Sequence, residues 1–432
     1  SGGGSAAGGG AAGGGQGGGS SPGGGGLDAG VDGGLPDAGS GTVLYPAGRT
    51  QSPLTAEVAA HLRRIVARAS TQPKVFSKIG DSNTVNTNYL ACFAGSAVTL
   101  DSHAALKPTL DFYKAGNAGG TTPYDRVTKA ATVGWSASAA IAGNPSPMEQ
   151  ELAAVNPQLA TVMFGTNDIQ SMNLDAYGRN MAAIADGLLD AGVVPLFTAI
   201  PPRDDSTTAD AVVPRYNAVA RAIAQARGFP FIDLHRELLT LPSHGIGPDG
   251  LHLNAAPGPK ACQLDAAGLQ YGQNRRNLLV LQALDRVHGA LTGAAPPDAQ
   301  ATRLQGAGTA TDPFRITALP FVHAGDTRRQ GANRLSTYPA CSAADESGPE
   351  LYYRLDLASP TNLRVHVVSL GAADLDVHLL GPGLSGSDCL ARNDAVVTRP
   401  AATGTLYLSV DTYVASSGAK PGEYLLAVLA DP

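Results

Sequence analysis

The chain has 432 residues, which is too many for one ordinary hydrophobic core, so we expect two folded domains. Its formal net charge of −6 is mild, and its Lys and Arg residues are scattered instead of gathered in a stripe. This pattern argues against nucleic acid as a partner. No apolar run approaches the roughly 20 residues needed to cross a bilayer, so we expect no transmembrane segment.

The first part of the chain is almost entirely Gly, Ala and Ser. Such a segment has little apolar surface to bury, so we expect a disordered Gly-rich linker over residues 1–42. The chain starts at Ser1 without an initiator Met, which leaves its original targeting signal open.

Residues 43–292 alternate short apolar runs with amphipathic segments. Strands are predicted at 75–79, 160–164, 193–200 and 229–234, and helices at 55–69, 175–190, 214–227 and 277–288. This alternation is typical of an α/β domain, in which helices cover both faces of a parallel sheet.

The pattern changes after residue 292. Residues 293–311 are rich in Ala, Gly, Pro and Thr, which predicts a linker that lets two domains move separately. Over residues 312–432, apolar and polar residues alternate in short runs separated by Gly, Pro and Asp. The predicted strands are 351–357, 363–368, 375–380, 405–410 and 424–429. They indicate a small antiparallel β-sandwich.

Three polar fragments follow predicted strands of the first domain or lie in the loops beyond them. They are Gly80-Asp81-Ser82-Asn83, Gly165-Thr166-Asn167-Asp168 and Asp249-Gly250-Leu251-His252. Because open α/β sheets gather their sites at the carboxyl ends of their strands, we expect these fragments to meet.

The side chains in the fragments are those of a nucleophile and a base. Ser82 is the candidate nucleophile, because a serine just past a buried strand sits where helix N–H groups face its hydroxyl. A simple helix N-cap is its alternative role, and Asp81 is expected to cap the same turn. His252 is the candidate base, and Asp249 is placed to orient it.

The order of these fragments resembles that of the SGNH/GDSL hydrolases, whose blocks are G-D-S, a glycine, G-x-N-D and D-x-x-H. The resemblance implies an SGNH-type, flavodoxin-like sheet and a Ser82, His252 and Asp249 triad that needs neither metal nor organic cofactor. It also implies an oxyanion hole made by the Ser82 N–H, the Asn167 amide and a glycine N–H.

The glycine of the oxyanion hole is ambiguous, because Gly119-Gly120 and Gly134 both fit. We choose Gly134, since residues 131–136 imitate the short strand and small hydroxyl residue that surround the family's glycine. The choice makes residues 83–130 an unusually long insertion. Its aromatic residues predict a lid that stacks on a sugar or holds an acyl chain, or else a small core of the insertion itself. They are Tyr89, Phe93, Phe112, Tyr113 and Tyr124, followed by Trp135.

Two other histidines, His235 and His244, compete with His252 for the role of base. Only His252 has an acid at the spacing of the family, so we expect the others to be surface or packing residues. A metal site that joins both of them to Asp249 and His252 is the alternative, but it lacks the H-E-x-x-H register.

The four cysteines divide evenly, with Cys92 and Cys262 in the first domain and Cys341 and Cys389 in the second. This division predicts one disulfide in each domain of an exported protein, with free buried thiols as the alternative. None of them forms a C-x-x-C pair, so a zinc or redox site has little support.

The predicted sandwich resembles the bacterial pre-peptidase C-terminal (PPC) domain. The resemblance rests on residues 348–353, 374–377 and 422–424. It allows a calcium site at Asp374, Asp376 and Asp411, although turn formation is the alternative role for these acids. The Gly/Ser leader is similar to the tether of bacterial lipoproteins, which implies a secreted or surface-anchored protein.

These features together predict an exported serine esterase that hydrolyses carboxylic esters. A sugar-linked O-acetyl ester is the expected substrate, because small-acyl deacetylation is frequent in the family and a sandwich suits polymer targeting. A hydrolase of lipid or longer-chain esters, or a thioesterase, is one alternative. A catalytically inactive surface-binding protein is the other, and the oligomeric state stays open.

Overall fold

The computed structural model describes residues 41–431, with only the backbone of Gln330. The linker predicted over residues 1–42 therefore lies outside the described residues, except for its last two. Gly41 donates its N–H to the Leu304 carbonyl at 2.9 Å and Thr42 is buried, so these two belong to the folded part. Within the described part, no helix is both long and apolar enough to cross a membrane.

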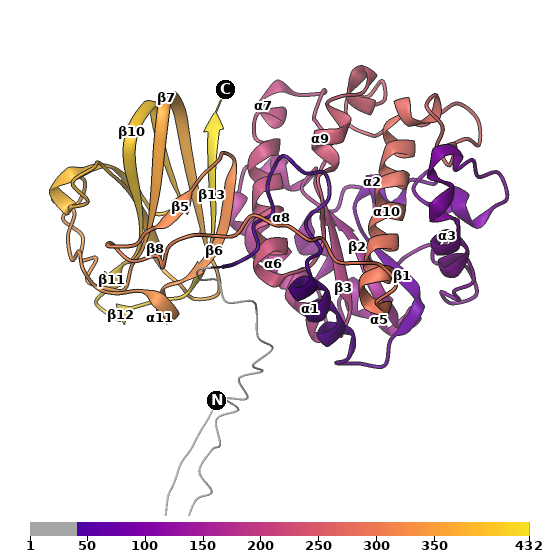
Figure 1. Cartoon of the computed structure of the whole chain (residues 1–432), viewed down its shortest axis with the longest axis horizontal. Coiled ribbons are helices and arrows are strands. Elements are labelled where there is room, and N and C mark those ends of the chain that lie inside the picture. Colours follow the sequence, from indigo (N-terminus) through magenta and orange to yellow (C-terminus); the bar gives the residue numbers. More distant parts are fainter. Residues whose placement is uncertain (1–40, 432) are drawn as a thin grey trace, which may run out of the picture. The chain divides into compact units, whose positions relative to one another are not determined.

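A four-stranded parallel sheet lies at the centre of residues 41–292, here called the α/β region. Its strands are β1 (Gln72–Gly80), β2 (Pro157–Met163), β3 (Val194–Thr198) and β4 (Phe231–Ile232), adjacent in that order. These strands are buried almost throughout, because helices flank the sheet (Figure 1). Val, Ile and Phe are common in such buried strands. The predicted α/β fold is confirmed.

Four longer helices match the predicted ones, namely α1 (Ala56–Val66), α6 (Leu174–Asp190), α8 (Val213–Arg227) and α10 (Gly272–Thr292). Helix α6 buries Tyr177, Met181, Ile184 and Leu188, whose spacing of three and four residues makes one apolar face. Helix α8 is buried on nearly all sides. It therefore packs against more than the sheet.

Shorter helices fill the connections. They are α2 (Ser82–Val85), η1 (Ala91–Ala94), η2 (Asp101–Leu106), α3 (Lys107–Lys114), α4 (Ala137–Ala140), α5 (Pro147–Val155), η3 (Asp168–Ser171), α7 (Thr207–Asp210), α9 (Leu234–Leu238), η4 (Pro242–Gly245) and η5 (Gly268–Gln270). Most are too short to be stable alone, so tertiary packing holds them. Helix α5 begins with a capping box between Ser146 and Glu149, a signal that the sequence analysis missed.

The insertion between α2 and the Gly134 turn has an aromatic core. The ring of Phe76 in β1 lies 5.5 Å from that of Tyr113 and 5.3 Å from that of Tyr124, and Phe93 meets Tyr124 at 5.3 Å. Tyr89 is also buried. These side chains therefore form a core of the insertion that covers β1, which is the second of the two roles predicted for them, and they do not form a lid.

Both predicted disulfides are confirmed. Cys92 pairs with Cys262 at a Cα–Cα distance of 5.7 Å, and Cys341 pairs with Cys389 at 5.8 Å. The first bond ties the insertion to the loop that precedes η5, and the second ties the loop after α11 to the start of β9. Each pair lies within one region of the chain.

Residues 312–431, here called the β-region, form an antiparallel sheet. Its elements are β5 (Phe314–Ile316), β6 (Phe321–Asp326), α11 (Thr327–Gln330), β7 (Leu351–Ser369), β8 (Leu375–Leu380), η6 (Gly386–Asp388), β9 (Cys389–Asn393), β10 (Val396–Thr412), β11 (Val414–Ala415), β12 (Gly418–Ala419) and β13 (Glu423–Asp431). The strand order is β6-β13-β7-β10-β8-β9, and β5 adds to β7 in parallel. The two strands predicted at 351–357 and 363–368 are halves of β7, which carries Pro360 where it is exposed.

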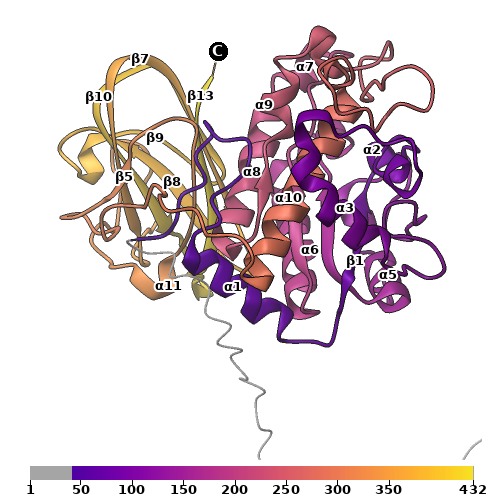
Figure 2. The same ribbon diagram turned by 45° about the vertical axis from the view of Figure 1, so that its right-hand side comes forward.

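The two regions share a hydrophobic core. Strands β6 and β13 contact α8, and β7 contacts α6 (Figures 1 and 2). The apolar side chains of the β-region that join the core of the α/β region are Val322, Ala324, Val368, Leu370, Leu425, Ala427 and Leu429. Gly178 in α6 permits this approach, because a Cβ there would lie 2.9 Å from Val368 Cγ1. This contact explains why α8 is buried on nearly all sides.

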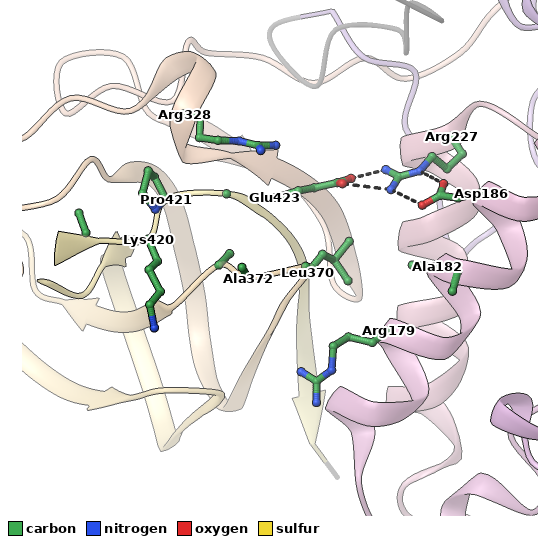
Figure 3. A pocket seen from close by; sticks show the side chains of 15 residues that line it. Arg179, Ala182, Asp186, Arg227, Arg328, Leu370, Ala372, Lys420, Pro421 and Glu423 are labelled. Carbon is green, nitrogen blue, oxygen red and sulfur yellow. Dashed lines mark hydrogen bonds and ion pairs between the residues drawn. The ribbon is translucent and has the colours of Figure 1, made fainter. Parts of the chain in front are cut away.

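Polar contacts join the same two surfaces. The Arg227 guanidinium is held between Asp186 of α6 and Glu423 of β13 (Figure 3), and the Gln225 amide donates to the Val322 carbonyl at 3.0 Å. A groove of about 730 Å³ lies beside the Arg227 network. The two regions are therefore attached by both apolar and charged contacts.

The connection over residues 293–311 is also attached. Leu304 is buried in the core of the β-region, and Arg303 forms a β-bridge with Val43. The free movement expected from a linker does not fit these contacts. The domain boundaries themselves stay a prediction.

Candidate active site

The candidate nucleophile lies at the carboxyl end of β1. Gly80 ends the strand, and a Cβ on it would lie 2.7 Å from the Met163 carbonyl oxygen, so only glycine fits. Asp81 caps α2, because its Oδ1 accepts the Asn83 N–H at 3.0 Å. Ser82 is thus the first residue of the helix and not its cap. Its hydroxyl is left for another partner.

That partner is His252. Its Nε2 lies 2.8 Å from Ser82 Oγ, and its Nδ1 lies 2.7 Å from Asp249 Oδ2. The other Asp249 oxygen accepts the N–H groups of Leu251 and His252, each at 3.0 Å. Partial burial acts to raise the pKa of Asp249, but these hydrogen bonds lower it to about 2. The carboxylate is therefore ionised and orients the imidazole toward Ser82.

The fragment Gly165-Thr166-Asn167-Asp168 lies next to the Gly134 turn. The Asn167 amide donates to the Trp135 carbonyl at 2.9 Å, and the Asp168 carboxylate accepts the Ala137 N–H at 3.0 Å. Gly134 has a φ of +80°, which suits glycine. Because an amide carries two N–H groups, Asn167 keeps one donor for a ligand.

The alternative glycines lie elsewhere. A Cβ on Gly119 would lie 3.1 Å from the Arg126 guanidinium and 3.8 Å from Val155. Val155 packs against Val75 in the first half of β1, whereas Ser82 follows its last residue. The geometry therefore favours Gly134 over Gly119-Gly120 as the neighbour of Asn167.

The buried Arg276 supports the turn and was missed by the sequence analysis. The Arg276 guanidinium stacks 3.6 Å from the centre of the Tyr89 ring and donates to the Asn83 carbonyl at 2.6 Å. It also lies near Asp81, whose pKa is raised to about 6 by burial and partly lowered by the Asn83 N–H and by Arg276. Only the doublet Arg275-Arg276 inside an apolar helix hinted at such a role.

The remaining predicted candidates do not join the Ser82 site as a metal centre. His244 Nδ1 lies 2.9 Å from Asp204 Oδ1. His235 is half-buried, and burial lowers the pKa of the His235 imidazole. Within residues 41–431, no group of three or more His, Cys, Asp or Glu side chains is arranged to hold a metal ion. The sequence alternative that joined His235 and His244 to Asp249 and His252 is therefore not seen.

The acids of the β-region differ from the expected turn residues. Asp376 lies inside β8 and Asp411 inside β10, opposite each other and both buried. Arg392 pairs with Asp376, and the Tyr338 hydroxyl donates to Asp411 at 2.5 Å. Turn formation is thus wrong for these two. Buried acids in strands need protein partners, which is what they have.

A hydrogen-bonded serine, histidine and aspartate at the carboxyl edge of a parallel α/β sheet form the arrangement of an acyl-transfer triad. Residues 79–256 match the model of the GDSL-like Lipase/Acylhydrolase family. They form a GDSL-like lipase/acylhydrolase domain, and the chain is a carboxylic ester hydrolase.

Solved structures similar to this chain include a GDSL-like lipase from Bacteroides thetaiotaomicron, with 15% sequence identity and a TM-score of 0.32. The match covers 54% of this chain and 98% of the lipase. An acetylxylan esterase from Geobacillus stearothermophilus has 15% identity and a TM-score of 0.32, over 50% of this chain and 93% of the esterase. A search of curated proteins found no match.

Proposed function

We propose that this protein is a serine esterase in which Ser82 attacks, His252 transfers the proton and Asp249 orients His252. The observation that carries the proposal is the unbroken chain from Ser82 Oγ to His252 at 2.8 Å and from His252 to Asp249 at 2.7 Å. An inactive surface-binding protein would have no need to keep this alignment.

The acylation step follows from the same contacts. Ser82 Oγ bonds to the ester carbonyl carbon while its proton passes to His252 Nε2. The Ser82 and Gly134 N–H groups and the Asn167 amide are the proposed donors to the resulting oxyanion. When the intermediate collapses, the bond to the alcohol oxygen breaks, and His252 returns its proton to that oxygen.

Deacylation repeats these events with water. His252 takes a proton from water while the water oxygen bonds to the acyl carbon, and the acid is released as Ser82 regains its proton. Asp249 stabilises the imidazolium in both steps. The proposed chemistry needs no metal or organic cofactor.

The proposed substrate is an O-acetyl ester on a carbohydrate, and polysaccharide is the proposed partner. The triad is shallow, since the side chains of His252 and Asp249 are 33% and 52% exposed. A shallow site suits an ester group presented on a large polymer, because the rest of the polymer cannot enter a deep pocket. The β-region, which we propose to be of the PPC type, would support such binding.

A longer acyl chain is a second candidate, and exposed apolar side chains favour it. Val85, Val133 and Met172 are large, exposed and apolar, and each is close along the chain to a proposed oxyanion donor. Exposed apolar groups beside a site suit apolar ligands. The same exposed apolar side chains would suit a lipid ester or a thioester.

A series of p-nitrophenyl esters tests both candidates. Turnover of p-nitrophenyl acetate is expected, and its absence in folded protein would remove the esterase proposal. A kcat/KM that falls from acetate to hexanoate supports the acetyl ester, whereas a rise supports the longer chain.

Export to the cell exterior is also part of the proposal. Two disulfides in the described residues are compatible with an extracellular protein, since disulfides persist in oxidising compartments. Secretion and attachment to the cell surface are both consistent with this chemistry.

A further inference from the structure

A second histidine and aspartate pair lies beside the triad. His244 Nδ1 is 2.9 Å from one oxygen of Asp204 and 3.2 Å from the other. The two side chains are 45% and 31% exposed, so the pair faces solvent. With Nδ1 held by the carboxylate, the other ring nitrogen of His244 is turned away from Asp204.

The backbone that presents His244 is strained. Ser243 and His244 have φ values of +47° and +50°, and Gly245 follows at +65°. Consecutive left-handed residues other than glycine cost free energy and persist only where their surroundings require them. Gly245 supplies part of that requirement, because a Cβ on it would lie 2.8 Å from Gly272 Cα at the start of α10.

Hydrogen bonds join this pair to the triad turn. Gly247 donates its N–H to the His252 carbonyl at 2.7 Å, and Asn254 donates to the Gly245 carbonyl at 3.0 Å. On the other side, the Asp205 N–H donates to the Gly250 carbonyl at 3.0 Å. Asp204 is therefore next to a residue bonded to the turn that carries Asp249 and His252, and His244 is next to Gly245, which is bonded to Asn254 just beyond that turn.

The segment that carries Asp204 also borders the proposed oxyanion hole. Arg203 is buried, donates to both oxygens of Asp205 at 2.7 and 2.8 Å, and donates to the Thr166 carbonyl at 2.6 Å. Thr166 directly precedes Asn167. Arg203 thus ties the segment to both sides of the site.

The direction of proton transfer decides which part of an ester meets this pair. His252 protonates the leaving alcohol, so the alcohol lies on the side of the 249–252 turn. The polar His244 and Asp204 pair therefore lies on the side of the site where the alcohol is expected.

We propose that His244 and Asp204 form a subsite for the alcohol part of the substrate, and that this alcohol is polyhydroxylated. The inference rests on the proposed esterase function. Nδ1–H of His244 donates to Asp204, and Nε2 accepts a hydrogen bond from a hydroxyl next to the ester. His244 binds substrate, and Asp204 is a positioning residue that acts through it.

The test compares two acetate esters that differ in the alcohol. A methyl glucoside carrying one O-acetyl group keeps free hydroxyls, whereas p-nitrophenyl acetate has none. His244→Ala should raise KM for the sugar ester by about 3- to 10-fold, the range for one lost hydrogen bond, with little change in kcat. Kinetics on p-nitrophenyl acetate should stay within about twofold. Asp204→Asn should change the same constants in the same direction.

Two further variants separate binding from backbone strain. In His244→Asn, the new residue tolerates a positive φ but lacks the ring Nε2 of histidine. This variant should therefore behave like His244→Ala. His288→Asn is the matched control, because it lies near the far end of α10 from Gly272 and should leave both esters unaffected.

Three results are decisive. Wild-type kinetics in His244→Asn would overturn the subsite and leave only a conformational role for His244. Equal losses on both esters would overturn it as well. If the wild type hydrolyses neither ester, the esterase function fails, and this outcome is distinct from a working enzyme that is insensitive to His244.

Discussion

Asp249 of the α/β region and Asp411 of the β-region both lie in hydrogen-bonded networks, but their pKa values are shifted in opposite directions. In the α/β region, Asp249 lies at the solvent edge, where bonds from N–H groups outweigh partial burial and lower its pKa to about 2. In the β-region, burial raises the pKa of Asp411 to about 9 and that of Glu350 to about 7. Hydrogen bonds outweigh burial at the solvent edge, whereas deeper burial outweighs the hydrogen bonds inside the β-region.

Other buried groups near Asp411 also have shifted pKa values. The His378 ring stacks on Tyr338 with centroids 3.6 Å apart, and burial lowers the pKa of His378 to about 3. Burial and the nearby Asp376 raise the pKa of Glu346. This cluster is buried inside the β-region, whereas the triad lies at a solvent edge, where a substrate can reach it.

Ser82→Ala should have the largest effect on activity. Losing the nucleophile is expected to lower kcat by about 10⁴-fold or more, while stability changes little, because Ser82 is at an accessible turn. Kinetics on p-nitrophenyl acetate and a thermal melt check both parts. An organophosphate should label the wild type but not the variant. Near wild-type turnover by the variant would assign the nucleophile to another serine.

Asn167→Ala should have the next largest effect. Loss of one oxyanion donor is expected to lower kcat by about 10²–10³-fold with a smaller change in KM. Steady-state kinetics on the same ester measures both. A change in KM alone would mean that Asn167 positions the substrate and does not stabilise the oxyanion.

Leu425→Ala tests the shared core. Leu425 is buried in β13 against the α/β region, so its truncation should cost about 2–5 kcal/mol of unfolding free energy. Leu408→Ala in the β-region's own core is the matched control. Both variants should unfold in one transition that includes the loss of esterase activity. Two separate transitions would show that the regions are independent.

Deleting residues 293–432 extends this test. The deletion exposes the apolar side chains of α6 and α8 that the β-region covers, so the remaining fragment should aggregate or melt at a lower temperature. A soluble fragment with full activity on p-nitrophenyl acetate would restore the separate domains that the linker composition predicts.

The test with the smallest effect on activity is the pH dependence of stability, because Asp411 is buried in β10 of the β-region. The pKa of Asp411 is raised on folding from its ordinary value of 3.8 to about 9, so the folded state binds a proton that the unfolded chain has lost. Its contribution is full below about pH 4 and decreases as the pH rises through about 9. Asp411→Asn should flatten this part of the profile in urea unfolding at pH 5, 7 and 9. An unchanged slope would mean that Asp411 is ionised when folded.

Much of the α/β region could be predicted because its signals are local. Apolar runs marked the strands, and each motif follows a strand or lies in a loop beyond one, so Ser82, Asn167, Asp249 and His252 were found together. The disulfide pairs were also predicted, because the four cysteines divide between two compositionally distinct parts. The boundaries of the strands were predicted less accurately, because two predicted strands form the single long β7.

By itself, the sequence determined the α/β class, the candidate triad and the separate β-rich part. Only the tertiary structure decided that Arg276 donates a hydrogen bond to the Asn83 carbonyl, that Gly134 lies beside Asn167, and that the two regions share one core. The physical reason is that these contacts join residues far apart in the chain, 193 positions for Arg276 and Asn83. Local periodicity carries no information on such pairs, because their distance depends on how all the elements between them pack.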